Sequence, residues 1–346
     1  MDIHRCRFVP YSPSAINAVA FSHSDTQNRK NAQVRLAVGR ANGDIEIWNP
    51  GEGRWHQEVV IHGGKDRSID GLVWVTDPDE TLEDGKTIPG RSRLFSIGYT
   101  TSVTEWDLEN ARPKRQASGQ HGDIWCLAAQ PAPKINAPGP ISDATNQIQP
   151  VQRLVGGTVD GALVLYSVQD DDLVFQRILA KSVTKKVQMV SMAFQSRHTC
   201  VVGCSDSTIR AYNMGNTNVV RRMTLGSDLA GGSKEIIVWA VKCLPNGDIV
   251  SGDSTGQICI WDGKTYTQAQ RIQSHKQDVL SLAISFDGSA ITSGGMDRRT
   301  VLYKKTDGSH SHSRWAKVTH RRYHHHDVKA MASFENKKMS VVVSGG

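Results

Sequence analysis

A fourteen-residue pattern recurs six times along the chain and constrains its fold more than any other feature. Each copy begins with apolar or small residues, passes through a short polar turn and ends on an aromatic residue. Two strands around an Asn, Asp or Thr turn form a β-hairpin. The copies cover residues 36–49, 94–107, 154–167, 200–213, 249–262 and 291–304, and a seventh begins at residue 342.

A short, mostly apolar run precedes each copy. Strands that are buried on both faces have this composition, and the innermost strand of a propeller blade lies in such an environment. A repeat of roughly 40–60 residues with this ending is the signature of a WD-repeat propeller. We therefore predict an all-β, WD40-type β-propeller over residues 1–346. The apolar runs are 16–22, 69–75, 124–130, 190–194, 238–244, 279–285 and 328–334.

The same repeats predict the number of blades. Seven inner strands and only six full hairpins are present, so we predict seven blades with the seventh incomplete. Residues Arg5–Val9 are predicted to form a strand that completes the last blade and closes the ring, which leaves no open sheet edge. The last blade would still lack a middle strand. We therefore expect this chain to be the first propeller of a longer protein.

Histidines precede several of the apolar runs. In WD-repeat proteins a His, a Ser or Thr, a turn Asp and a Trp form a buried hydrogen-bonded tetrad. No copy contains all four, since Thr100 replaces the Asp in one copy and Tyr303 replaces the Trp in another. A His-Asp-Ser trio also occurs in nucleophilic catalysis, but the repeat spacing and expected burial favour a structural role. The residues predicted to have this role are His62, Ser96, Trp106, His275, Ser293, Asp297, His121 and Asp160.

The positive charge is concentrated in one segment. The net charge is +7, and residues 296–329 alone hold a surplus of six basic residues together with six histidines. Three interpretations remain open: a solvated loop, a contact for RNA phosphates with Trp315 and Tyr323 stacking on bases, and a metal site made by the histidines. The candidate RNA-contact residues are Arg298, Arg299, Lys304, Lys305, Arg314, Lys317, Arg321 and Arg322.

Other features of the sequence exclude several classes of function. Phosphate-binding, dinucleotide-binding, zinc-protease and serine-hydrolase motifs are absent, so we predict no catalytic, cofactor or metal site. No apolar run is long enough to span a bilayer, the first residues do not resemble a signal peptide, and the cysteines have no metal-ligand spacing. These features predict that the protein is located in the cytosol or nucleus. Three insertions, 76–92, 131–151 and 304–326, interrupt the repeats and are candidates for partner binding.

Three segments resemble the cirhin family: HRCRFVPYSPSAINAVAFSH (4–23), DGLVW (70–74) and IWCLA (124–128). The resemblance covers the full chain. It implies a WD-repeat subunit of the t-UTP (UtpA) subcomplex of the small-subunit processome, or 90S pre-ribosome. Such a subunit is nucleolar, non-catalytic and free of cofactors. It would assemble with other t-UTP subunits on the 5′ external transcribed spacer of pre-rRNA.

These features favour a scaffold that supports pre-18S rRNA processing and pre-rRNA transcription through contacts with proteins and pre-rRNA, with no membrane or small-molecule substrate. The alternative is a peptide-binding WD40 adaptor, either a substrate receptor or a chromatin reader. A deep acidic or aromatic pocket at the centre of the ring would favour that alternative. A propeller enzyme would instead need carboxylates or metal ligands that converge in the central channel.

Overall fold

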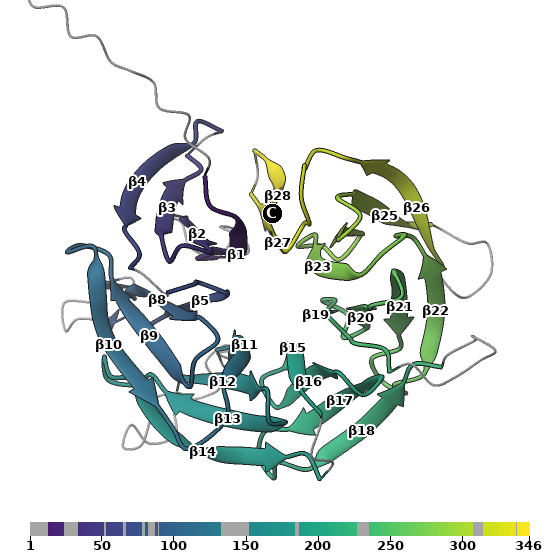
Figure 1. Ribbon diagram of the computed structural model, residues 1–346, viewed down its shortest axis with the longest axis horizontal. Coiled ribbons are helices and arrows are strands. Elements are labelled where there is room, and N and C mark those ends of the chain that lie inside the picture. The colour runs from purple at the N-terminus through teal and green to yellow at the C-terminus, as the bar shows by residue number, and fades with distance from the viewer. Residues whose placement is uncertain are drawn as a thin grey trace, which may run out of the picture.

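Six four-stranded antiparallel sheets are arranged around a central channel in the computed structural model (Figure 1). The described part of the chain contains strands and no helix, and therefore no helix that could cross a membrane. The residues that the structure describes are 13–23, 34–51, 53–64, 67–77, 80–81, 87–88, 90–132, 152–183, 187–226, 235–306, 314–336 and 338–346.

The first three blades contain one repeat hairpin each, flanked by an inner and an outer strand. Blade one consists of β1 (Ile16–Phe21), β2 (Leu36–Arg40), β3 (Ile45–Asn49) and β4 (His56–Ile61). Blade two consists of β5 (Gly71–Thr76), β8 (Ser92–Ile97), β9 (Ser102–Asp107) and β10 (Arg112–Ser118). Blade three consists of β11 (Ile124–Ala129), β12 (Arg153–Thr158), β13 (Ala162–Ser167) and β14 (Val174–Lys181).

The next three blades repeat this order. Blade four consists of β15 (Met189–Ser196), β16 (Thr199–Cys204), β17 (Thr208–Asn213) and β18 (Val219–Thr224). Blade five consists of β19 (Ala240–Cys243), β20 (Ile249–Gly252), β21 (Gln257–Trp261) and β22 (Gln268–Gln273). Blade six consists of β23 (Val279–Ile284), β24 (Ala290–Gly295), β25 (Thr300–Thr306) and β26 (Arg314–Arg321).

The predicted seven-blade count is not confirmed. Beyond the six blades, a two-stranded sheet of β27 (Ala330–Glu335) and β28 (Ser340–Gly345) packs between β23 and β1. The predicted closing strand Arg5–Val9 lies outside the described residues. All seven predicted apolar runs contain strands at the channel, and all six predicted hairpins are present.

The predicted insertions are described only in part. A separate short hairpin, β6 (Glu80–Thr81) with β7 (Thr87–Ile88), lies within the 76–92 insertion. Residues 133–151 and 307–313 lie outside the described ranges, so most of the 131–151 insertion and the middle of 304–326 stay untested.

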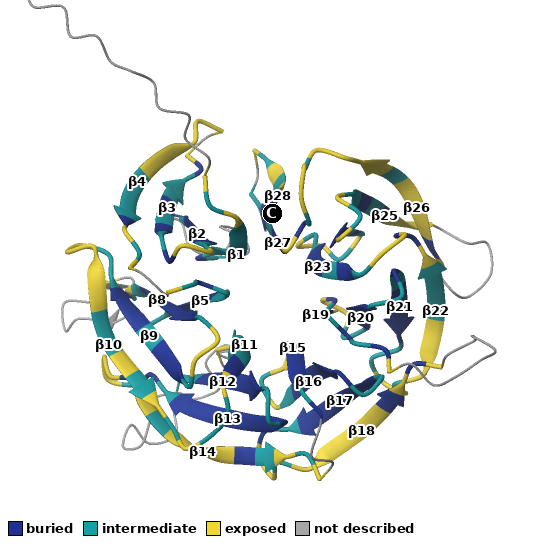
Figure 2. Cartoon of the chain, viewed as in Figure 1, coloured by how far each residue is buried: buried dark blue, intermediate teal, exposed yellow. Residues whose placement is uncertain are grey.

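The hydrophobic core is a series of seams between neighbouring blades. One cluster, for example, combines Phe95 and Val103 of blade two with Leu154 and Tyr166 of blade three. The middle strands are therefore the most buried, while much of the outer strands β10, β18 and β26 is exposed (Figure 2). The five described cysteines are unpaired, and burial raises the pKa of their thiols. They act as small hydrophobes within these seams.

Five of the six copies of the repeat have a glycine at their fourth position, and this glycine has a packing reason. A Cβ added at Gly203 would lie 2.4 Å from Ser191 Oγ and 2.8 Å from Val238 Cγ1. At Gly252, it would lie 2.5 Å from Val279 Cγ1 of the next blade. Such separations are shorter than carbon atoms tolerate, so the glycine allows the next blade to approach closely. The repeat therefore encodes the contact between blades as well as the hairpin.

Candidate functional site

The candidate RNA-contact residues lie on and beside the outer hairpin of blade six. β25 and β26 pair in a register that places Thr300 opposite Arg321 and Thr306 opposite Arg314. We call the eight residues the basic hairpin surface. The register places Arg298, Arg299, Arg321 and Arg322 near one end, Lys304, Lys305 and Arg314 near the other, and Lys317 between them.

These side chains have few partners. All eight are exposed except Arg299, which is half-buried. Arg299 Nε lies 3.9 Å from Asp297 Oδ2, and the other seven form no ion pair with any residue in the described ranges. Exposed cations that lack an ion-pair partner change the stability of a strand little, because water solvates them. They remain available to an anionic ligand.

The two aromatic residues predicted to stack on bases differ. Trp315 is only 5% exposed and packs in the seam between blades five and six. Its backbone N–H donates to Gln270 Oε1 at 2.9 Å, and its carbonyl accepts from Gln270 Nε2 at 2.8 Å. The prediction that Trp315 stacks on a base is therefore wrong. The alternation of side chains along β26 directs this ring into the core. Tyr323 is 72% exposed and can stack.

The His-rich segment provides no metal site among the described residues. His324 Nε2 lies 2.8 Å from Ser344 Oγ, which ties the segment to β28, and burial lowers the pKa of this imidazole. Within the part of the chain that the structure describes, no group of three His, Cys, Asp or Glu side chains is placed to hold a metal ion. His310 and His312 lie outside that part.

Blade six contains a hydrogen-bonded network of the predicted kind. His275 Nδ1 lies 2.8 Å from Asp297 Oδ1, and His275 Nε2 lies 2.7 Å from Ser293 Oγ. The Ser293 hydroxyl also lies 3.2 Å from the Tyr303 hydroxyl, so a tyrosine takes the place of the tryptophan. Burial lowers the pKa of His275, although the Asp297 carboxylate opposes this shift. The trio is enclosed, which favours a structural role.

The other predicted networks differ from blade six. The Trp106 indole donates to Ser96 Oγ at 2.8 Å, but the His62 side chain is 83% exposed and lies 3.9 Å from Asp44. The assignment of His62 to a buried network with these residues is therefore wrong. Its loop follows β4 and remains beside the turn of blade one, so His62 does not enter blade two.

In blade three, the predicted pair of His121 and Asp160 is divided between two separate contacts. His121 Nε2 lies 2.8 Å from the Tyr166 hydroxyl. Asp160 accepts from the Thr158 hydroxyl at 2.5 Å and lies 3.2 Å from Lys181 Nζ. Both side chains stabilise their own blade, but they do not form a single tetrad.

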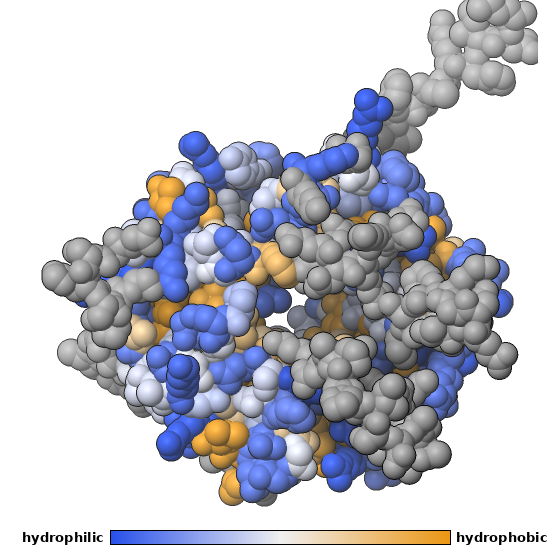
Figure 3. Space-filling view, turned by 180° about the vertical axis from the view of Figure 1, so that it is seen from behind, coloured by the Kyte–Doolittle hydropathy of each residue, from blue (hydrophilic) through white to orange (hydrophobic). Residues whose placement is uncertain are grey.

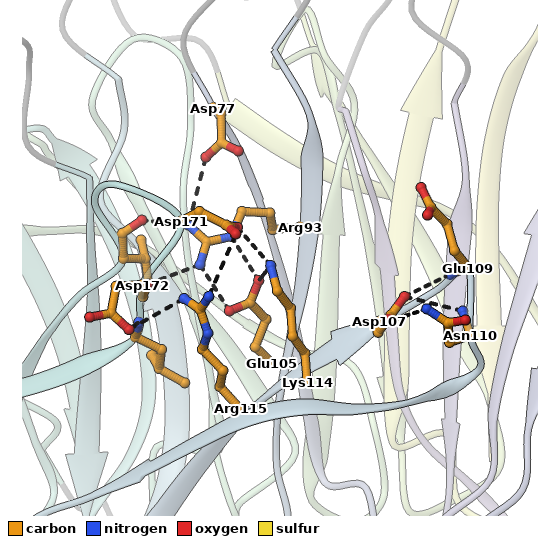
Figure 4. A network of polar contacts seen from close by, with 12 residues as sticks. Asp77, Arg93, Glu105, Asp107, Glu109, Asn110, Lys114, Arg115, Asp171 and Asp172 are labelled. Carbon is orange, nitrogen blue, oxygen red and sulfur yellow. Dashed lines mark hydrogen bonds and ion pairs between the residues drawn. The ribbon is translucent and has the colours of Figure 1, made fainter.

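A network of ion pairs joins blades two and three, and the sequence analysis missed it (Figure 4). Arg93 and Glu105 are 2% and 1% exposed and form two hydrogen bonds of 2.9 Å with each other. Arg93 also donates to the carbonyls of Val168 and Asp172, at 2.5 and 2.9 Å. Burial opposes the charge on Arg93, but Glu105 outweighs it and raises the pKa of the guanidinium.

Half-buried and exposed residues complete this network toward the surface. Lys114 Nζ lies 2.7 Å from Asp171 Oδ1 and 3.4 Å from Glu105 Oε1, and Asp77 lies 3.7 Å from Arg93. Arg93 lies in β8, a strand buried from Arg93 to Ile97, and Glu105 lies buried beside it on β9. The paired charges fix the two blades against each other and leave no free group for chemistry.

The central channel contains two cavities. One, of about 660 Å³, lies where the inner strands begin, and another, of about 450 Å³, lies where they end. The opening at the centre of the ring is also visible from behind (Figure 3). The first cavity is lined by Tyr99, Trp125 and Trp239 as well as by apolar residues. The sequence predicted mostly apolar residues on the inner strands that surround this cavity.

Comparison with known proteins agrees with this architecture. The family model for the WD domain, G-beta repeat, matches residues 225–262 and 266–304, which cover the hairpins of blades five and six. The sheets, the channel and these matches together define a WD40-type β-propeller protein.

The homologues of the chain give a more specific comparison than the WD-repeat model. They are named U3 small nucleolar RNA-associated protein 4, of the cirhin family. The Schizosaccharomyces pombe protein is 38% identical over 351 residues, which cover all of this chain and 44% of the relative. The Saccharomyces cerevisiae protein is 35% identical over 354 residues, covering all of this chain and 41% of the relative. The Mus musculus homologue is 27% identical over 348 residues, covering 99% of this chain and 44% of the relative. The chain thus spans less than half the length of these curated relatives.

Proposed function

We propose that this chain is a non-catalytic scaffold in ribosome biogenesis that acts in the nucleolus as part of the small-subunit processome. The names of its homologues associate them with U3 small nucleolar RNA, which supports a nuclear or nucleolar role beside RNA and protein. A WD40 propeller suits this role because rigid blades hold many loops at fixed positions.

The basic hairpin surface is the proposed RNA contact. Its seven exposed, unpaired cations lie along one hairpin of blade six, at the periphery of the ring. Clustered Lys and Arg side chains bind nucleic acid by releasing the counterions that surround phosphates. This accumulation of unneutralised charge is the observation that carries the proposal.

The proposal includes finer points of partnership and architecture. The RNA would be the 5′ external transcribed spacer of pre-rRNA, and the protein partners would be other t-UTP subunits. The scaffold would support pre-18S rRNA processing and pre-rRNA transcription. In this arrangement β27 and β28 are the inner half of a seventh blade, which their position between β23 and β1 supports.

The test measures RNA affinity as a function of salt. Reversing two charges on β26, Lys317→Glu with Arg321→Glu, should weaken binding of a 5′ external transcribed spacer fragment by about tenfold or more. It should also lower the slope of log K against log salt by about 0.7 for each lost contact to a single-strand phosphate. Filter binding or fluorescence anisotropy over a salt series provides both values.

The matched control reverses Arg177 and Arg221, exposed residues on the outer strands of blades three and four. This variant changes the net charge equally, so a local contact predicts that it retains most of the wild-type slope. If the β26 variant keeps the wild-type affinity and slope, the hairpin is not the RNA contact. The alternative function, peptide binding at the ring centre, is favoured by a separate group of aromatic side chains.

A further inference from the structure

Three aromatic side chains from three different blades meet at the mouth of the central channel. Tyr99 lies in the turn between β8 and β9, Trp125 is the second residue of β11, and Trp239 precedes β19. The Tyr99 and Trp125 ring centroids are 5.0 Å apart, and those of Trp125 and Trp239 are 6.3 Å apart. We call these three residues the aromatic collar. All three line the 660 Å³ cavity.

The collar does not belong to the hydrophobic core. None of its members is part of an inter-blade cluster of the described residues, and Tyr99 is 48% exposed. Tyr99 also has a φ of 46°, a left-handed conformation that is unfavourable for an aromatic residue. A strained backbone that holds an exposed ring at a cavity is typical of a binding surface.

The charge around the collar indicates what it binds. Asp70 lines the same cavity, and its Oδ1 accepts from Asn17 Nδ2 at 2.9 Å. Its Oδ2 is shielded from solvent and has no hydrogen-bond partner among the described residues. Burial raises the pKa of Asp70, against the opposing effects of Ser68, Asn17 and Lys329. A half-buried carboxylate in a cavity wall is most readily satisfied by a cationic donor.

The carboxylate of Asp278 strengthens the same preference. It accepts a hydrogen bond from the Trp239 indole N–H at 2.7 Å. An anion on the edge of an indole increases the negative potential of the ring face, which attracts cations. Asp327 lines the cavity together with Asp70, so three carboxylates lie around the collar.

Two lysines line the cavity: Lys329 lies beside the collar, just before β27, and Lys242 lies deeper, where it limits how far a cation can enter. Lys329 lines the cavity, and its Nζ lies 3.4 Å from Asn17 Oδ1. Lys242 lines both cavities. Because Lys242 lies between the two cavities, it repels a cation that enters beyond the collar. The favourable position is therefore the mouth of the channel.

We propose that the aromatic collar and Asp70 bind the positively charged side chain of a lysine or arginine that a protein partner presents to the channel. The rings supply cation–π contacts and the carboxylate supplies a charged acceptor. The three carboxylates outnumber the two lysines, so the collar favours a cationic side chain over a phosphate group. The collar thus gives the scaffold a protein-binding surface that is independent of the basic hairpin surface.

The test uses five-residue probe peptides, Ser-Gly-X-Gly-Ser, in which X is lysine, trimethyllysine, arginine or neutral norleucine. Ligand-observed NMR titration against the whole chain measures their affinity. We expect at least one cationic peptide to bind about tenfold more tightly than the norleucine peptide. A preference for trimethyllysine or for arginine would identify the cation, and either preference supports the proposal.

Variants locate the binding. Asp70→Asn and Trp125→Leu should each weaken the cationic peptide by about tenfold. Tyr323→Leu, an exposed aromatic outside the cavity, and Asp287→Asn, an exposed carboxylate in a turn, should leave it unchanged. Thermal melts establish that each variant is folded. Should Trp125→Leu fail to fold, Trp239→Phe with Asp70→Asn provides the same comparison.

Several results would overturn the proposal: equal binding of norleucine and cationic peptides, no binding of any peptide at millimolar concentration, or unchanged affinity in the collar variants. Loss of binding to a single-stranded RNA oligonucleotide in the collar variants, without peptide binding, would assign the collar to nucleobases instead. The RNA test on β26 has a separate readout, so the failure of one proposal leaves the other intact.

Discussion

The seam between blades two and three and the outer hairpin of blade six both concentrate basic residues, but in opposite environments. At the seam, Arg93 is enclosed, and its polar contacts are to Glu105, to backbone carbonyls and to neighbouring carboxylates. On the hairpin, seven cations are exposed and have no ion-pair partner in the described ranges. Enclosed charge stabilises a structure only when its partners are complete, whereas exposed charge contributes little to stability and remains available to a ligand.

The largest effect is expected from removing one partner at the seam. Glu105→Ala leaves the Arg93 guanidinium enclosed without its carboxylate, so the free energy of unfolding should fall by about 3–5 kcal/mol. Urea denaturation followed by circular dichroism measures this loss. Glu109→Ala, an exposed position in the next turn, is the matched control and should change stability by less than about 0.5 kcal/mol. A small loss for Glu105→Ala would mean that the two regions do not differ as proposed.

An intermediate effect is expected from the enclosed network of blade six. His275→Gln leaves the buried hydroxyl of Ser293 and the carboxylate of Asp297 poorly paired, which should cost about 1–3 kcal/mol at neutral pH. Because burial lowers the pKa of His275 below the ordinary 6.5, the folded state binds the proton less readily than the unfolded state. The contribution of this network to the free energy of unfolding is therefore present above pH 6.5 and is lost as the pH falls below 6.5.

The pH dependence separates this network from exposed histidines. Asp297 has a lowered pKa, so its own contribution is lost only in more acidic solution, as the pH falls below the ordinary 3.8. Melting temperatures between about pH 7 and about pH 5 should fall less steeply for His275→Gln than for the wild type. His62→Gln, which alters an exposed ring, should keep the wild-type slope. Identical slopes for all three proteins would exclude His275 as the source.

The smallest effect on stability is expected from the basic hairpin surface. Lys317→Glu with Arg321→Glu should change the free energy of unfolding by no more than about 0.5 kcal/mol, because both side chains are solvated and unpaired. Urea denaturation alongside the Glu105→Ala variant checks this. A loss comparable with that of Glu105→Ala would show that the hairpin charges are structural.

The sequence predicted some site residues better than others. His275, Ser293 and Asp297 occupy fixed positions of one repeat, and their network lies within one blade. Trp315 was misassigned because alternation along β26 places it in the seam with blade five. His62 was misassigned because nothing local determines which blade the loop after β4 follows.

The sequence by itself determined the strands and the hairpins, because two-residue alternation and turn chemistry act between neighbours in the chain. Only the tertiary structure decided which residues meet around the channel. Tyr99, Trp125 and Trp239 belong to three different blades, and no periodicity within one repeat relates them. They converge because the blades are arranged around one axis, which turns equivalent strand ends from distant repeats toward a common centre.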